Sequence, residues 1–358
     1  MKTDQIQKVH KDWYKLDLSA IVYPTLQRRD FSSVYRLSVL LKEDIDPEIL
    51  QRAVNLTMPR FPTYKAAIRK GVFWRYLEPN DRPGPFVQED VKNPCQPMHF
   101  KGNNRYLVRI YYYRNRIALE AHHSLGDGTG GMCVLQTLTA TYLRLKGHSE
   151  IENGGFVLDI LGIPDPGELE DAYMKYANAK VCPPRPGEKT YRVRGTKEPF
   201  YTLNIIDGIM SVSEVMQVAK SYNATITEYL NSVLLYALMQ KQESEWHLKL
   251  RPVKIAMPVN LRRFFPSRTL RNFITMIYPG IDPRLGEYTF EEIVTQVYNY
   301  MRYYLNEKLL RGDITTNAET QRNPFIRIVP LFIKDLVVRQ FYTKIQDKNS
   351  SAGLTNMG

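Results

Sequence analysis

The sequence predicts an α/β protein with two domains, and three observations support that class. The chain has 358 residues, more than one hydrophobic core usually serves. In both halves, stretches that alternate like strands are followed by stretches with helical spacing. Residues 146–199, between the halves, are rich in Pro and Gly and lack a sustained pattern, which is typical of a crossover. We therefore expect an N-terminal domain over 1–150, a linker over 151–198 and a C-terminal domain over 199–358.

The first half alternates strand and helix patterns. Asp46 supplies an N-cap and Pro47 a first-turn proline, and apolar residues then recur at helical spacing until Pro59. Residues 106–113 and 117–122 are two apolar runs around a short turn, which predicts a hairpin. The other elements expected here are an apolar opening segment at 13–24, strands at 31–41 and 64–77, a loop at 79–100 and a helix over 132–145.

The second half is marked by capping boxes, in which Ser or Thr is followed three residues later by Glu. Such pairs open helices at Ser211, Thr225 and Thr289, and we expect the last of these helices to run to about residue 310. The other elements expected here are strands at 253–259 and 273–278, a helix over 330–341 and the start of a strand at 353–358.

Composition narrows the class of protein. Apolar residues make up 43% of the chain and charged residues 24%, as in an ordinary globular protein. No apolar run reaches the length of a membrane span, and the N-terminus lacks a signal-peptide core. Three cysteines are too few and too scattered for a disulfide framework or a zinc site, which favours a cytoplasmic location. The net charge of +12 suits a polyphosphate cofactor, an acidic carrier protein, nucleic acid or an anionic membrane, and equally a basic solvated surface.

The most informative stretch is HHSLGDG at residues 122–128. Two of the six histidines, His122 and His123, end a predicted strand, and Asp127 and Gly128 precede a predicted helix. A single histidine at a strand end is most often a buried polar residue bonded to a carbonyl, and Asp127 alone fits a helix cap. Four fixed positions together are more specific than any one of them.

Three chemistries compete for this stretch. Adjacent residues of a strand point to opposite faces, so His122 and His123 are not expected to hold one metal ion. Gly126, Gly128 and Gly131 match the spacing of a dinucleotide fingerprint, but the flanking strand and acidic residue of that motif are missing. General-base catalysis remains, in which one neutral imidazole takes a proton from an attacking hydroxyl, amine or thiol.

HHSLGDG resembles the HHxxxDG signature of the coenzyme-A-dependent acyltransferase superfamily, which includes chloramphenicol acetyltransferase and the condensation domains of peptide synthetases. The resemblance covers most of the chain and is closest to bacterial alcohol-acetyltransferase-like members. It also rests on residues 13–17 (WYKLD), 61–62 (FP), 71–74 (GVFW), 258–262 (PVNLR) and 355–358 (TNMG). It implies two chloramphenicol acetyltransferase-like domains, each an α+β two-layer sandwich, with an active-site tunnel between them. Members of the family run longer, so we expect the second domain to be incomplete.

The resemblance also implies roles for individual residues. His123 would be the general base and His122 structural. Asp127 would pair with an arginine of the second domain, for which Arg262 is the first candidate and Arg263 the second. The remaining supporting residues are Gly128, small enough for an acyl thioester to approach, and Asn260, Asn272, Thr355 and Asn356. No metal site is expected, and the residues that would bind a cofactor are not identified.

The function expected from this is transfer of an acyl group from a thioester, acyl-coenzyme A, to a small-molecule alcohol or amine. No tightly bound cofactor is implied, and we expect a monomer that binds no nucleic acid. Two alternatives stay open. One is a condensation-like enzyme that takes its acyl group from a carrier protein, and the other is an inactive binding protein of the same fold.

Overall fold

The computed structural model describes residues 13–28, 31–180, 188–196, 198–200, 202–245, 249–344 and 349–357. The proline-rich run 183–187 of the predicted linker and the last residue of the TNMG segment lie outside these ranges. The strands are β1 (Tyr14–Lys15), β2 (Val34–Leu40), β3 (Ala66–Lys70), β4 (Arg75–Pro79), β5 (Val87–Glu89), β6 (Val108–Tyr113), β7 (Arg116–His122), β8 (Val253–Asn260), β9 (Ile274–Ile277), β10 (Gly280–Ile281) and β11 (Ala352–Gly353). The helices are α2 (Tyr23–Leu26), α3 (Pro47–Thr57), α4 (Gly128–Leu145), α5 (Ala172–Tyr176), α6 (Val212–Ser221), α7 (Ile226–Glu243), α8 (Phe290–Tyr304), α9 (Glu307–Arg322), α10 (Pro324–Ile328) and α11 (Leu331–Lys344).

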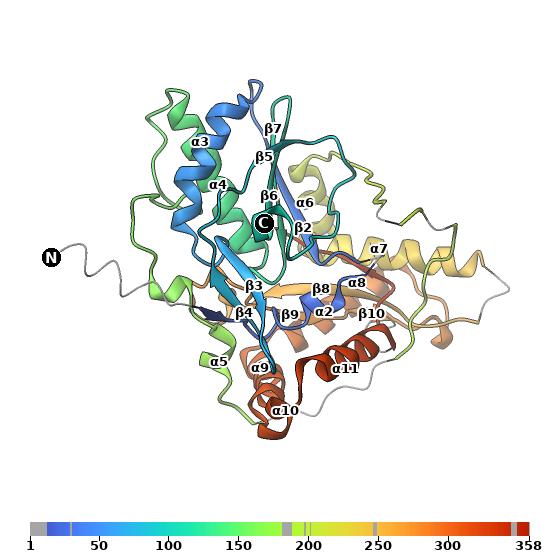
Figure 1. Cartoon of the computed structure of the whole chain (residues 1–358). Coiled ribbons are helices and arrows are strands. Elements are labelled where there is room, and N and C mark those ends of the chain that lie inside the picture. Colours follow the sequence, from blue (N-terminus) through green and yellow to red (C-terminus); the bar gives the residue numbers. More distant parts are fainter. Residues whose placement is uncertain are drawn as a thin grey trace.

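The first half is built on a four-stranded sheet in the order β2-β7-β6-β5. The predicted hairpin is confirmed as β6 and β7, and Arg114 at its turn has a φ of 49°. Asp46 caps α3 through the backbone N–H groups of Glu48 and Ile49, as predicted. Figure 1 shows α3 and α4 beside this sheet. β5 lies inside the predicted loop 79–100 and adds to β6 in parallel, so the sequence pattern missed one edge strand.

The second half has its own smaller sheet. β8 is the central strand and pairs with β9, β10 and β11, and α7 and α8 pack beside it (Figure 1). The capping boxes at Thr225 and Thr289 are present, because each hydroxyl accepts the N–H of the glutamate three residues on and each glutamate bonds back. A third sheet, β1-β4-β3, lies between the two halves in the view of Figure 1.

The described residues form three hydrophobic cores under these sheets, and two of these cores draw on both halves of the chain. The first-half core includes Leu270, and the core around Phe265 and Phe273 includes Tyr173 of α5 with Leu18 packed against it. The third core lies between β8, α7 and α8. The fold class predicted from the sequence is confirmed, whereas the boundaries at residues 150 and 198 stay predictions.

The structure corrects several predicted elements near the C-terminus. The helix expected to reach residue 310 ends at Tyr304, and Asn306 begins a second helix, α9, by accepting the N–H of Leu309. The polar sequence of α9 hid its helical spacing. The strand expected at 353–358 covers only Ala352–Gly353, which pair with β8 in parallel. None of the described helices is both long and apolar enough to cross a membrane.

Candidate active site

His123 lies just past the end of β7, where the chain turns toward α4. Its N–H bonds to the carbonyl oxygen of Ser33 (2.9 Å), which ties the turn to the start of β2. Two tyrosine rings hold the imidazole. Tyr23 stacks on it with ring centroids 4.8 Å apart and planes 19° apart, and Tyr35 lies at 4.6 Å with a tilt of 46°. The imidazole therefore has little freedom to rotate.

The electrostatics of this pocket keep the imidazole of His123 neutral. Burial lowers its pKa from 6.5 to about 4, and the nearby carboxylate of Asp127 opposes that shift without overcoming it. Nδ1 is buried and has no hydrogen-bond partner among the described residues. A neutral imidazole with a free nitrogen is what a general base requires.

His122 faces the other way, as the alternation of a strand demands. It is fully buried, its ring meets that of Phe100 edge to face at 5.4 Å, and its Nδ1 accepts the N–H of Ser124 (3.2 Å). Burial, with a smaller contribution from His123, lowers the pKa of His122 to about 3. His122 is therefore enclosed by the protein, and its structural role stays a prediction.

Asp127 starts α4 and at the same time reaches the second half of the chain. Its Oδ1 accepts the N–H groups of Thr129 (3.1 Å) and Gly130 (3.3 Å), which makes it the N-cap. Its Oδ2 accepts from Arg262 Nη1 (2.8 Å) and from the N–H of Phe273 (2.9 Å), and Arg262 Nη2 lies 3.3 Å from Oδ1. The predicted ion pair between Asp127 and Arg262 is therefore present. The carboxylate thus joins the first turn of α4 to Arg262 and Phe273 of the second half.

Every nitrogen of the Arg262 guanidinium donates hydrogen bonds to other groups of the protein. It donates to the carbonyl oxygens of Thr269 (2.8 Å) and Arg271 (2.6 Å) and to the side chain of Asn260 (3.2 Å). Asn260 also donates to the hydroxyl of Thr129 on α4 (3.2 Å), so it supports the same contact. The second candidate, Arg263, is exposed at the surface and is not the partner of the aspartate.

Glycines let the second half approach the start of α4 closely. A Cβ on Gly126 or Gly130 would lie 2.5 or 2.0 Å from the carbonyl oxygen of Leu270, which leaves no room for any side chain. At Gly128 a Cβ would meet the side chain of Met357, 2.8 Å from its Cε. The closing segment thus reaches the motif, as the resemblance implied. The space beside Gly128, predicted to admit a thioester, is filled by a methionine.

Asn272 occupies a place that the sequence did not predict. Its Nδ2 donates to the carbonyl oxygen of His123 (2.9 Å) and to Asp17 (3.2 Å), so it holds the backbone of the candidate base and does not face a substrate. Asp17 is completely buried and also pairs with Arg271, whose Nε lies 3.7 Å away. Burial raises the pKa of Asp17 to about 6, and Arg271 acts in the opposite direction.

Four neighbours of the candidate site were not predicted as such, and two of them had a signal in the sequence. Asp17 belongs to the WYKLD segment that carried part of the resemblance, and Arg271 belongs to the basic group Arg262, Arg263, Arg268 and Arg271. Nothing marks Tyr23 and Tyr35 among 24 tyrosines. Thr355 is exposed after β11.

Asn356 bonds to the hydroxyl of Thr227 on α7 (2.9 Å), so its amide is turned to that helix. The predicted tunnel stays a prediction.

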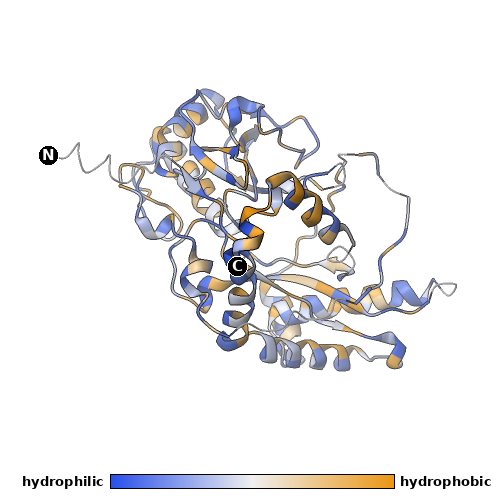
Figure 2. Cartoon of the chain, turned by 60° about the horizontal axis from the view of Figure 1, so that its bottom comes forward, coloured by the Kyte–Doolittle hydropathy of each residue, from blue (hydrophilic) through white to orange (hydrophobic). Residues whose placement is uncertain are grey.

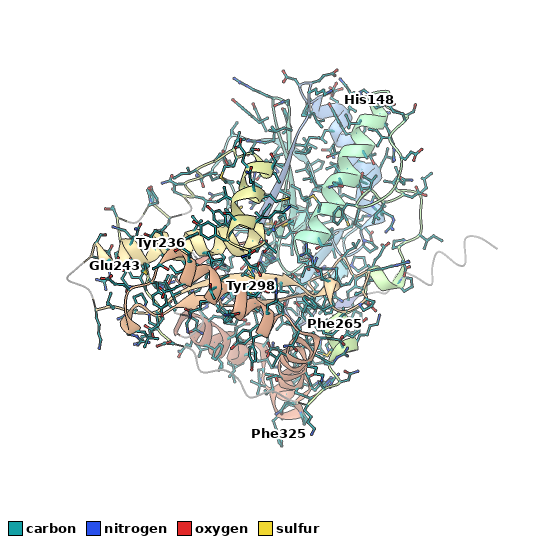
Figure 3. All side chains as sticks on the ribbon, turned by 180° about the vertical axis from the view of Figure 1, so that it is seen from behind. His148, Tyr236, Glu243, Phe265, Tyr298 and Phe325 are labelled. Atoms are coloured by element: carbon teal, nitrogen blue, oxygen red, sulfur yellow. The ribbon has the colours of Figure 1, made fainter. Side chains whose placement is uncertain are left out.

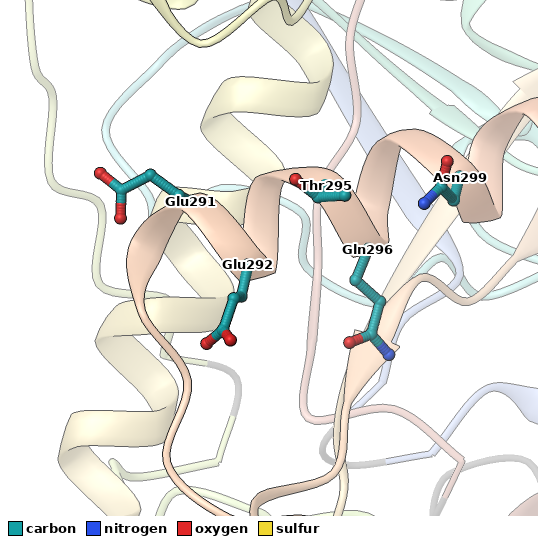
Figure 4. Close-up of a pocket in the computed structure, with 5 residues that line it drawn as sticks. All are labelled: Glu291, Glu292, Thr295, Gln296 and Asn299. Carbon is teal, nitrogen blue, oxygen red and sulfur yellow. The ribbon is translucent and has the colours of Figure 1, made fainter.

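A shallow hollow on the outer side of α8 is separate from this site (Figure 4). It is lined by Glu291, Glu292, Thr295, Gln296 and Asn299. All five lie on one helix and Figure 4 shows them spread along it, as on a solvated helical surface. Within the described residues, no group of three or more His, Cys, Asp or Glu side chains is arranged to hold a metal ion.

No family model matches the sequence, and no curated protein matches it. Solved structures do match. TRI101 of F. graminearum, complexed with coenzyme A and deoxynivalenol, is 11% identical with a TM-score of 0.55 over 96% of this chain and 84% of that one. Polyketide synthase associated protein 5 from Mycobacterium tuberculosis is 15% identical with a TM-score of 0.54 over 84% and 75%. The starter condensation domain of rhizomide synthetase RzmA, in complex with C8-CoA, is 13% identical with a TM-score of 0.54 over 89% and 76%.

These matches define the fold class. The chain shares the fold of proteins that include condensation domains, which is the fold that the HHxxxDG resemblance implied. At such low identity the likeness is one of fold, and the chemistry has to be argued from the site itself.

Proposed function

We propose that this protein is an acyltransferase that moves an acyl group from a thioester to an alcohol or amine, with His123 as the general base. One observation carries the proposal: a neutral imidazole, in contact with two tyrosine rings, on a turn that the Asp127–Arg262 pair holds in place. Such fixed placement is the main requirement for general-base catalysis.

In the proposed reaction, His123 carries one proton from the acceptor to the leaving thiolate. Nε2 of His123 takes the proton of the acceptor hydroxyl or amine as its oxygen or nitrogen attacks the thioester carbonyl. The tetrahedral intermediate then breaks its carbon–sulfur bond, and the leaving thiolate takes the proton back from the imidazolium. The first turn of α4 adds a favourable dipole near the developing negative charge. Two of its N–H groups, of Thr129 and Gly130, already bond to Asp127, so it offers few free donors.

Acyl-coenzyme A is the proposed donor. Two of the similar structures contain coenzyme A or an acyl derivative of it, which supports this choice. The tightest basic group in the sequence, Arg262, Arg263, Arg268 and Arg271, is a candidate phosphate site, but Arg262 and Arg271 pair with buried carboxylates. Arg268 pairs with Asp165 at the surface and Arg263 is exposed, so these two are the members of the group left to meet a phosphate.

Thiol release from acyl-coenzyme A thioesters tests the proposal, over a panel of alcohols and amines. His123→Ala should lose acceptor-dependent release by at least about a hundredfold, the usual contribution of a general base. The matched control is His148→Ala, because His148 is exposed and lies at the far end of the first half (Figure 3), and its imidazole contacts the exposed side chain of Glu150. Full activity in His123→Ala would refute the assignment of the base.

A condensation-like reaction with a carrier-bound donor is the second candidate, because condensation domains are among the similar structures. Supplying the same acyl group on a carrier protein and on coenzyme A separates the two donors. If the folded protein releases thiol from neither, an inactive binding protein of this fold is the better description. The monomeric state and cytoplasmic location remain predictions.

A further inference from the structure

Helix α11 carries its apolar residues on the outside. Asp335 and Tyr342, one heptad apart, point inward. Asp335 accepts from Arg75 (2.5 Å) and from the hydroxyl of Thr25 (2.8 Å) in the first half. The outward positions are Phe332, Ile333, Leu336, Val337 and Phe341, which recur at intervals of three and four residues and are 39–73% exposed. A helix with its apolar stripe turned to solvent indicates a missing partner.

The same face continues beyond α11 into two neighbouring segments. The N–H of Leu331 bonds to the carbonyl oxygen of Val72 (2.8 Å), and Lys334 Nζ bonds to those of Phe73 (3.0 Å) and Arg327 (3.2 Å). These bonds hold the tip of the β3–β4 hairpin and α10 against α11. Figure 2 shows α10 and α11 as an orange, apolar segment toward the viewer, and Figure 3 shows Phe325 projecting at the edge of the molecule. We call this surface the α10–α11 face; its main exposed side chains are Val72, Trp74, Phe325, Ile328, Phe332 and Leu336.

Positive charge surrounds the α10–α11 face. Lys70 lies at the base of the hairpin tip, and Arg327 and Lys334 lie on the two helices. Burial and the charge of Arg327 both lower the pKa of Lys334, so the cations here repel one another. The only acidic residue in the sequences of α10 and α11 is Asp335, which is turned inward to Arg75.

We propose that the α10–α11 face docks on an anionic lipid surface. Exposed Phe, Leu and Trp side chains bordered by Lys and Arg are what an interfacial helix presents to a bilayer, with the apolar groups between the headgroups and the cations against lipid phosphates. A second copy fits less well, because a two-fold contact through this face would gather the three cations of each copy, Lys70, Arg327 and Lys334, in one interface. The docking is independent of the proposed acyl transfer.

Flotation with lipid vesicles tests the docking. The whole chain should bind vesicles of phosphatidylcholine with about one-third phosphatidylserine, and bind phosphatidylcholine alone much more weakly. High salt should weaken the binding because it screens the lipid charge. Lys70→Gln and Arg327→Gln should each lower the affinity for anionic vesicles roughly fivefold, since a basic residue near such a surface contributes about 1 kcal/mol.

The apolar part is tested with the double variant Phe332→Ser and Leu336→Ser, which should lose vesicle binding. Leu161→Ser is the matched control, because Leu161 is 89% exposed in the linker and belongs to no part of this face. Equal binding to neutral and anionic vesicles, no binding at all, or unchanged binding by the double variant would each overturn the proposal. It is also overturned if sedimentation shows a dimer that the double variant converts to monomers. If the double variant does not fold, the two glutamine variants decide.

Discussion

Replacing Asp127 by asparagine removes the charge from the contact that joins the two halves at the site. Both oxygens of Asp127 are engaged, the residue is 2% exposed, and the partner side chain of Arg262 is 12% exposed. Breaking such a buried pair on one side costs about 3–5 kcal/mol, because the remaining charge stays buried without compensation. The asparagine oxygen still accepts the first N–H groups of α4, so the helix cap survives. Asp127→Ala loses that cap as well and should cost about 1 kcal/mol more.

The free energy of unfolding in urea, followed by circular dichroism, measures these differences. The double variant Asp127→Asn with Arg262→Met provides the internal control, since it leaves no unpaired charge. Its cost should be smaller than the sum of the two single costs by more than about 1 kcal/mol. A loss below about 1 kcal/mol in Asp127→Asn, or strict additivity in the double variant, would show that the pair does not hold the halves as the distances indicate.

Two further predictions concern burial at the same site. The lowered pKa values of His122 (about 3) and His123 (about 4) mean that these two residues bind two more protons in the unfolded chain than in the folded one between about pH 4 and 6. The raised pKa of Asp17 (about 6) means that this residue binds one more proton in the folded chain over the same range. For the three residues together, the unfolded chain therefore binds about one more proton. These three groups together should make stability fall as the pH drops, and they contribute a slope of about 1.4 kcal/mol per pH unit. The slope should double in Asp17→Asn, and a flat pH profile in the wild type would contradict the shifts. Gly130→Ala would place a Cβ 2.0 Å from a backbone carbonyl oxygen and should destabilise the fold by at least about 2 kcal/mol in the same urea assay. Gly208→Ala is the control, because a Cβ there meets nothing within 4 Å. Equal stability of the two variants would refute the close approach at Gly130.

What the sequence predicts well is what neighbouring residues determine. The β6–β7 hairpin and the caps at Asp46 and Thr225 follow from patterns over a few residues, and the structure contains all of them. The contact of Asp127 with Arg262 spans 135 positions, and only the family resemblance predicted it. The catalytic significance of Asp127 and Arg262 stays a prediction.

The sequence does not predict contacts between residues that lie far apart in the chain and belong to no common motif. Tyr23 stacks on His123 from 100 positions away, and Asp17 bonds to Asn272 across 255 positions. Nothing in the sequence around Tyr23 distinguishes a ring that holds an imidazole from one that fills a core. α9 is harder to predict for another reason: its apolar stripe is short, Leu310, Ile314 and Ala318, in an otherwise polar sequence, and it packs against α5.

The candidate base belongs to the first half, but the second half fixes its position. Asn272 bonds to the carbonyl of His123, Arg262 to Asp127 on the following turn, and the carbonyl of Leu270 packs against the glycines between them. A chain that kept HHSLGDG and lost these three contacts would retain the imidazole without its placement. Misplacement by about 1 Å is enough to cost a base roughly a hundredfold in rate. The proposed chemistry of the motif therefore requires both halves to be folded together, and the loop at 262–272 belongs to the candidate site as much as the histidines do.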